Sequence, residues 1–86
     1  MFQLDYSYRA NQFLKKLDKH IAKRIIDKLE NLKQNSVPSN VKFIHRENNE
    51  MVFRYRIGDY RALYKVKKDE EIILITKIDK RPKVYK

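Results

Sequence analysis

The chain has 86 residues, no Cys, and 21 Lys and Arg against 11 Asp and Glu, which gives a formal net charge of +10. This length sets a ceiling of one domain, placed over residues 1–86, and the 42 % of hydrophobic and 12 % of aromatic residues are typical of a folded globule rather than a basic tail. No apolar run reaches the roughly 18 residues of a membrane span, and residues 1–5 lack the layout of a signal peptide. Because the chain has no Cys, thiolate zinc sites are excluded. We therefore expect a cytoplasmic protein with no membrane partner and with anionic partners.

The first half of the chain is expected to form a strand followed by two helices. Phe2 and Leu4 alternate with polar neighbours, which indicates a short strand. Apolar residues then recur at helical spacing in residues 10–17 and again in residues 21–32, with Asp5 or Ser7 placed to cap the first helix. The interval 18–20 is short enough for an antiparallel helical hairpin, and Pro38 lies in the loop that ends it.

The second half is expected to form strands over residues 52–57, 60–67 and 71–78. Gly58-Asp59 is a two-residue turn pair in which Gly takes a positive φ, and residues 68–70 connect the third strand. We place His45 in a loop with residues 46–49, as a structural or surface residue. The resulting fold class is α+β, with an antiparallel sheet of about four strands, the order βααβββ, and the helix pair on one face.

The Gly58-Asp59 turn predicts the register of the hairpin that surrounds it. Arg56 is placed directly opposite Arg61, and the residues sort onto two faces. The core face includes Tyr60 and Tyr64, which we interpret as packing residues. The other face carries five cations: Arg54, Arg56, Arg61, Lys65 and Lys67.

Opposed like charges destabilise a sheet by a few tenths of a kcal/mol, whereas a polyanion bound over them reverses the sign of that contribution. Arg also presents a planar fork that binds phosphate through two N–H groups. The pattern therefore favours phosphodiester binding over a merely solvated face. The C-terminal segment adds Lys80, Arg81 and Lys83, and Tyr85 there can stack on a base or donate a proton.

Residues 53–66, with Arg56-Ile57-Gly58-Asp59-Tyr60-Arg61 at their centre, resemble the RelE/ParE toxin superfamily, whose motif is R-x-G-[DS]-Y-R-x-x-Y. The resemblance extends to the preceding strand and helix pair and to the run Ile78-Asp79-Lys80-Arg81. It implies a toxin of a type II toxin–antitoxin pair with a RelE-like, microbial-RNase-like fold.

Within the superfamily the sequence is most similar to the RelE branch. That resemblance implies a ribosome-dependent, metal-independent endoribonuclease that cuts the mRNA codon in the A site, using the ribose 2′-hydroxyl as the attacking group. The implied catalytic residues are Arg54, Arg61 and Arg81, with Tyr85 stacking on the substrate base. RNA-binding residues are expected at Arg56, Lys65, Lys67, Lys80 and Lys83.

Two departures from the RelE pattern bear on the mechanism. Val52 and Arg54 stand where RelE toxins place lysines, and a guanidinium is a poor general base. The interval from Arg81 to Tyr85 is also shorter than in RelE toxins. Catalysis would then rest on electrostatic stabilisation of the phosphorane, with the base weakened or supplied by ribosomal RNA.

We expect no cofactor and no metal, because His20 and His45 lack the paired spacing of metal ligands. The expected partners are the ribosome, mRNA and an acidic RelB-like antitoxin, with which the chain forms a hetero-oligomer. Two other functions stay open. One is a ParE-like toxin that inhibits DNA gyrase without cutting RNA, and the other is a plain nucleic-acid-binding module.

Overall fold

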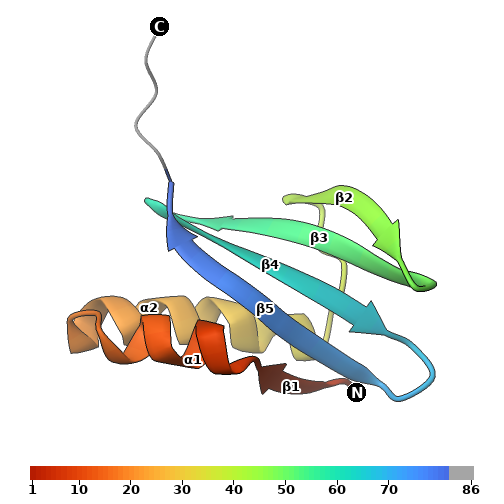
Figure 1. Cartoon of the computed structure of the whole chain (residues 1–86), viewed down its shortest axis with the longest axis horizontal. Coiled ribbons are helices and arrows are strands. Elements are labelled where there is room, and N and C mark those ends of the chain that lie inside the picture. Colours follow the sequence, from red (N-terminus) through yellow and green to blue (C-terminus); the bar gives the residue numbers. More distant parts are fainter. Residues whose placement is uncertain (82–86) are drawn as a thin grey trace, which may run out of the picture.

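The computed structural model describes residues 1–81, which form two α-helices, a short 3-10 helix and one sheet of five strands (Figure 1). In chain order the elements are β1 (Gln3–Tyr6), α1 (Tyr8–Lys15), α2 (Lys19–Glu30), η1 (Asn31–Lys33), β2 (Val41–Glu47), β3 (Glu50–Ile57), β4 (Tyr60–Lys67) and β5 (Ile72–Lys80). The strands lie in the order β1-β5-β4-β3-β2. Only the β1–β5 pair of these is parallel. The predicted α+β class is confirmed, and the count of about four strands is corrected to five.

Local side-chain hydrogen bonds fix where both helices begin. The Ser7 hydroxyl accepts a hydrogen bond from the Ala10 backbone N–H at 3.1 Å, so Ser7 rather than Asp5 caps α1. The same hydroxyl donates to the Thr76 carbonyl at 2.8 Å, which ties the start of α1 to β5. Asp18 caps α2 through the His20 backbone N–H at 2.9 Å. None of the helices in residues 1–81 is long and apolar enough to cross a membrane.

Both helices lie along one face of the sheet, where Figure 1 shows them side by side. Their apolar faces pack against alternate residues of the strands, because successive side chains of a strand point to opposite faces. The largest fully buried side chains of this core are Ile25, Leu29, Leu32, Tyr64, Ile73 and Ile75. The predicted core face of the hairpin is confirmed: its members are buried, except that Tyr60 is partly buried.

The β3–β4 hairpin has the predicted register from Met51 opposite Val66 to Ile57 opposite Tyr60. Gly58 has φ +60°, in the left-handed region that glycine enters without steric cost. A Cβ at this position would meet the Arg24 guanidinium at an ordinary 3.6 Å, so the requirement for Gly comes from the backbone angle.

Strand β2 is the element that the sequence pattern misses. His45, Arg46 and Glu47 belong to this edge strand rather than to a loop, and His45 lies opposite Val52 in β3. The pairing shifts register between Phe43 and His45, which breaks the simple alternation that marks a strand.

Candidate functional site

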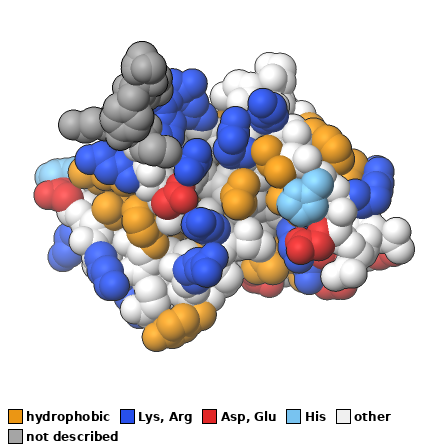
Figure 2. Space-filling view, turned by 45° about the horizontal axis from the view of Figure 1, so that its top comes forward, with side chains coloured by type: hydrophobic (Ala, Val, Ile, Leu, Met, Phe, Trp, Pro, Cys, Tyr) orange, Lys and Arg blue, Asp and Glu red, His pale blue; other side chains and the backbone are white. Residues whose placement is uncertain are grey.

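The uncovered face of the sheet brings the predicted cations together near the β3–β4 turn. Arg56 lies directly opposite Arg61, as the turn predicts, and Arg54 lies two residues further along the same face of β3. Arg56 is exposed, whereas Arg54 and Arg61 are half-buried. Figure 2, which brings this side of the molecule forward, shows many Lys and Arg side chains with isolated acidic side chains between them.

An acidic residue outside the predicted set of site residues continues the Arg56–Arg61 row onto β5. Asp79 lies opposite Arg61, and the Arg61 Nε–H donates to Asp79 Oδ1 at 2.9 Å. The Lys77 Nζ lies 3.6 Å from the other carboxylate oxygen, Oδ2. The β4–β5 register was the missing signal, since it alone places Asp79 beside Arg61.

Arg54 has a different set of neighbours from Arg61. Lys42 of β2 and Leu63 of β4 lie opposite it on the two sides. Among residues 1–81 it forms no ion pair, so its guanidinium is available to an anion that approaches the open face.

The end of β5 is attached to the β3–β4 turn. The Arg81 backbone N–H donates to the Asp59 carbonyl at 2.7 Å, which brings Arg81 to the same end of the sheet as Arg56 and Arg61. Lys80 behaves differently, because it pairs with Tyr60, whose side chain packs on the helix side. Lys80 lines a pocket of about 230 Å³ there together with Arg24 of α2. Lys80 is therefore separated from the Arg61 face, although its role in RNA binding stays a prediction.

The two remaining predicted residues of the tail are Lys83 and Tyr85, and both lie outside the described residues 1–81. Their predicted roles, RNA binding for Lys83 and base stacking for Tyr85, stay predictions.

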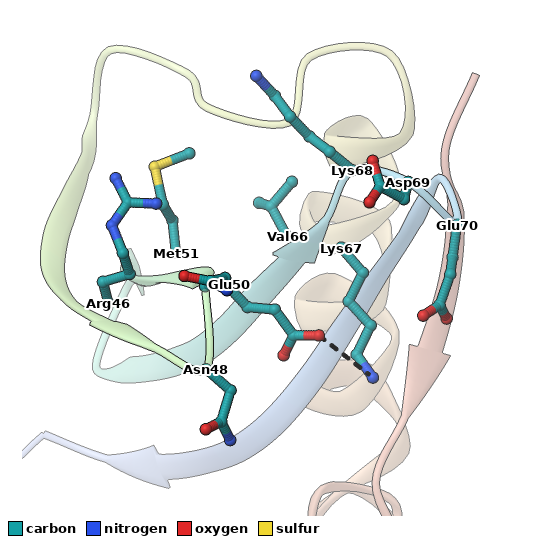
Figure 3. Close-up of a pocket in the computed structure, with 10 residues that line it drawn as sticks. Arg46, Asn48, Glu50, Met51, Val66, Lys67, Lys68, Asp69 and Glu70 are labelled. Atoms are coloured by element: carbon teal, nitrogen blue, oxygen red, sulfur yellow. Dashed lines mark ion pairs between the residues drawn. The ribbon is translucent and has the colours of Figure 1, made fainter.

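Lys65 and Lys67 lie at the other end of the open face, and both are held by acids. The Lys65 Nζ lies 3.1 Å from Glu47 Oε1 and 3.9 Å from Glu50 Oε1, and the Lys67 Nζ lies 3.8 Å from Glu50 Oε2. Figure 3 shows Glu50 and Lys67 pointing toward one another beside a pocket of about 450 Å³ between the β2–β3 and β4–β5 loops. The charge at this end is largely compensated, whereas the turn end carries an excess of cations.

Val52, at one of the two positions where the resemblance to RelE toxins leads us to expect a lysine, is only 4 % exposed. It lies on the open face between His45 and Lys65 of the neighbouring strands. The side chain at this position is therefore apolar and buried between polar neighbours, and it supplies no accessible basic group.

The tyrosines in the body of the sheet have structural partners. Tyr64 is fully buried, and its hydroxyl donates to the Ser36 carbonyl at 2.7 Å, so its predicted packing role is confirmed. Burial, with a smaller contribution from Tyr55, raises the pKa of the Tyr64 hydroxyl far above its ordinary value. Burial and then the Glu30 carboxylate raise the pKa of Tyr6 to about 12. The Tyr6 hydroxyl has no hydrogen-bond partner among the described residues.

No group of three or more potential metal ligands occurs within residues 1–81. His20 lies at the start of α2, and His45 lies on β2. The predicted cations that the open face gathers at its turn end are the guanidinium groups of Arg54, Arg56 and Arg61. Such groups bind the oxygens of a phosphodiester and stabilise the extra negative charge that develops on phosphorus during attack by a hydroxyl.

Comparison with known proteins connects this geometry to a family. The family model described as the ParE toxin of the type II toxin-antitoxin system, parDE, matches residues 4–85. A candidate toxin of Methanocaldococcus jannaschii, RelE1, is 35 % identical over 86 residues, which is 99 % of this chain and 96 % of that protein.

Solved structures of RelE toxins have the same fold. The archaeal RelE–RelB complex from Pyrococcus horikoshii OT3 superposes with a TM-score of 0.85 at 23 % identity, covering 96 % of this chain and 98 % of that chain. The isolated Escherichia coli RelE toxin gives a TM-score of 0.77 at 18 % identity, covering 98 % and 88 %. The RelBE2 toxin–antitoxin complex of Mycobacterium tuberculosis gives 0.77 at 23 %, covering 93 % and 98 %. The family match over most of the chain, with the M. jannaschii relative, shows that this chain belongs to the RelE/ParE superfamily of toxins of type II toxin–antitoxin systems.

Proposed function

We propose that this toxin is a ribosome-dependent endoribonuclease of the RelE type, which cuts mRNA in the A site and so stops translation. The observation that carries the proposal is the row of guanidinium groups at the turn end of the open face, where Arg56 lies opposite Arg61. Arg54 on the same face and the attachment of Arg81 to Asp59 add two more Arg residues at this end.

The proposed reaction needs groups that stabilise charge more than it needs a strong base on the toxin. The ribose 2′-hydroxyl attacks the neighbouring phosphorus, and its proton passes to a base. The bond between phosphorus and the 5′-oxygen of the next nucleotide then breaks, that oxygen takes up a proton, and a 2′,3′-cyclic phosphate is left behind. The phosphorane formed in between carries two negative charges, and fixed N–H donors around it lower the barrier. Arg61 and Arg81 supply such donors in the proposal, and Arg54 adds a third.

The distribution of charge supports a nucleic-acid substrate at one end of the sheet only. Glu47 and Glu50 compensate Lys65 and Lys67, whereas Arg54 and Arg56 form no ion pair within residues 1–81. A single RNA strand is therefore expected to cross the turn end of the face, with the remaining Lys side chains giving general attraction to ribosomal RNA.

The proposed partner in the cell is an acidic antitoxin, with which the chain forms a hetero-oligomer. The similar solved structures include RelE–RelB complexes, and the net charge of +10 favours an acidic protein over a neutral one. The edge strand β2 also exposes Phe43 by 50 % and Ile44 by 37 %, which gives an antitoxin segment an apolar contact at the edge of the sheet.

A second candidate function is ParE-like inhibition of DNA gyrase without RNA cleavage. Two observations favour it: the family model that matches is the one described as the ParE toxin, and the lysine position of RelE toxins is occupied by buried Val52. The chain would then use its basic face only to bind its target and would cut no RNA.

The test adds the purified toxin to a translating extract and maps the 5′ ends of the message. The RelE-type function predicts new ends within codons and their loss in Arg61→Ala and Arg81→Ala. Lys23→Ala, which removes a cation of α2 that lies 3.0 Å from Asp27, should still cut. Intact message together with inhibited supercoiling by gyrase would decide for the ParE-like function.

A further inference from the structure

We propose that Asp79 is a positioning residue for Arg61, and that it improves the cleavage step although it weakens the binding of RNA. The inference rests on the proposed RelE-type function, because it concerns the same phosphodiester site.

The first observation is the direct pairing of the two residues across the β4–β5 ladder. Arg61 and Asp79 lie on the same rung, and the Nε–Oδ1 distance is 2.9 Å. Their side chains are only 33 % and 30 % exposed, so this pair is better shielded than an ion pair on a fully solvated surface. A charge-assisted hydrogen bond in that setting restricts the rotation of the guanidinium.

The second observation is which nitrogen Asp79 engages. The hydrogen bond uses Nε, and the two terminal nitrogens of Arg61 form no side-chain hydrogen bond with the described residues. Those terminal nitrogens are the pair that binds two phosphate oxygens at once. The carboxylate therefore holds one edge of the guanidinium and leaves the other edge for substrate.

The third observation is the position of Arg56 on the opposite side of Arg61. Two guanidinium groups on one rung repel one another, and without a further partner Arg61 would sample several rotamers. Asp79 attracts Arg61 toward β5, and Lys77 lies 3.6 Å from the second carboxylate oxygen. Arg56, Arg61 and Asp79 thus form a row across β3, β4 and β5, in which Arg61 is repelled by Arg56 and attracted by Asp79.

The Asp79 carboxylate is expected to lower the affinity for RNA although it raises the rate of cleavage, because its negative charge lies beside the expected phosphate. A competing anion would lower affinity and leave the rate of the bound complex unchanged, whereas a positioning residue raises that rate. Removing Asp79 is therefore predicted to move binding and cleavage in opposite directions, which neither a purely structural residue nor a purely competing anion would produce.

The experiment measures, on ribosomes programmed with a defined mRNA, the dissociation constant of the toxin and the single-turnover cleavage rate at saturation. Asp79→Ala is expected to bind about three- to tenfold more tightly and to cut at least about tenfold more slowly. Asp79→Asn removes the charge but keeps an acceptor for Nε, so it should bind as tightly as Asp79→Ala and cut at a rate between those of wild type and Asp79→Ala. Asp69→Asn makes the same change of charge in the exposed β4–β5 loop and serves as the control, with an unchanged rate.

Asp79→Glu provides a second variant, because it keeps the charge but lengthens the side chain. It should cut more slowly than wild type without binding more tightly. Tighter binding of Asp79→Ala with an unchanged or higher rate would overturn the inference, as would weaker binding in all three Asp79 variants. A wild-type protein that cuts no message would instead overturn the proposed function, and this inference with it.

Discussion

Arg56 and Arg61 face one another across the β3–β4 ladder, so two positive charges occupy one rung of the sheet. A sheet selected only for stability would place a small or oppositely charged residue at one of these positions. The unfavourable contact is consistent with a site that is completed by an anion, and it gives the first prediction.

Arg56→Thr is expected to raise the free energy of unfolding by about 0.5 kcal/mol, because it removes the repulsion and introduces a residue favoured in strands. Lys67→Thr makes a comparable change of residue type but removes a cation that lies 3.8 Å from Glu50. Urea unfolding should therefore rank Arg56→Thr as the more stable variant. The opposite ranking would contradict the assignment of repulsion to the Arg56–Arg61 rung.

Removing each of the two buried tyrosine hydroxyls is expected to change the stability of the protein in opposite directions. Tyr64→Phe should destabilise the protein by about 1 kcal/mol, because the Ser36 carbonyl loses its donor. Tyr6→Phe should stabilise it by about 1 kcal/mol, since the Tyr6 hydroxyl is buried without a partner among the described residues. Thermal and urea denaturation of both variants check this prediction, and destabilisation in both would refute the contrast.

Tyr6 also predicts a loss of stability at alkaline pH. Its pKa is raised to about 12 by burial and by Glu30, while in the unfolded chain it titrates near its ordinary value of 10.0. The unfolded state therefore releases a proton first, so the free energy of unfolding is unaffected by this group below pH 10 and falls as the pH rises from 10 toward 12.

Measured by urea unfolding across this pH range, Tyr6→Phe should show a shallower decline in stability than wild type. Tyr8→Phe, at a position that is 80 % exposed, should decline as wild type does. Equal slopes for Tyr6→Phe and wild type would show that burial does not hold the Tyr6 hydroxyl neutral.

The uneven compensation of charge predicts which cations contact RNA. For a single-stranded oligonucleotide, each phosphate contact contributes about 0.7 to the slope of log affinity against log salt. Arg56→Ala should reduce the slope by about that amount, because Arg56 forms no ion pair within residues 1–81. Lys65→Ala should change the slope less, because Lys65 lies 3.1 Å from Glu47. A larger change of the slope in Lys65→Ala than in the turn-end variant would contradict the placement of RNA at the turn end of the face.

The sequence was sufficient to predict the hairpin and its basic face, because the position of a two-residue turn determines which residues pair along the two strands that it joins. Gly58 in a two-residue loop places Arg56 opposite Arg61 by counting alone, and the structure has that register. The amphipathic spacing of residues 21–32 likewise predicted α2, although the last turn of this stripe, which holds Leu32, is the 3-10 helix η1.

Strand β2 and the role of Asp79 could not be predicted in the same way. β2 is an exposed edge strand with a register shift, so its polar residues do not alternate cleanly, although the left-handed pair Asn48 and Asn49 is a turn signal that could have revealed it. The β4–β5 pairing shifts between Leu63 and Tyr64, so counting back from the intervening loop does not place Asp79 opposite Arg61. The parallel pairing of β1 with β5 depends on tertiary packing, for which the local sequence carries no pattern.

We propose that the guanidinium row at the turn end of the sheet cuts RNA, and the single-turnover cleavage rate of A-site mRNA on purified ribosomes tests this for wild type, Arg61→Ala and Lys23→Ala. Arg61→Ala is expected to cut about 100-fold more slowly than wild type. Lys23→Ala, which alters a cation on α2 paired with Asp27, is expected to stay within about threefold of wild type. Equal rates for Arg61→Ala and wild type, or no cleavage by the wild type, would contradict the proposal.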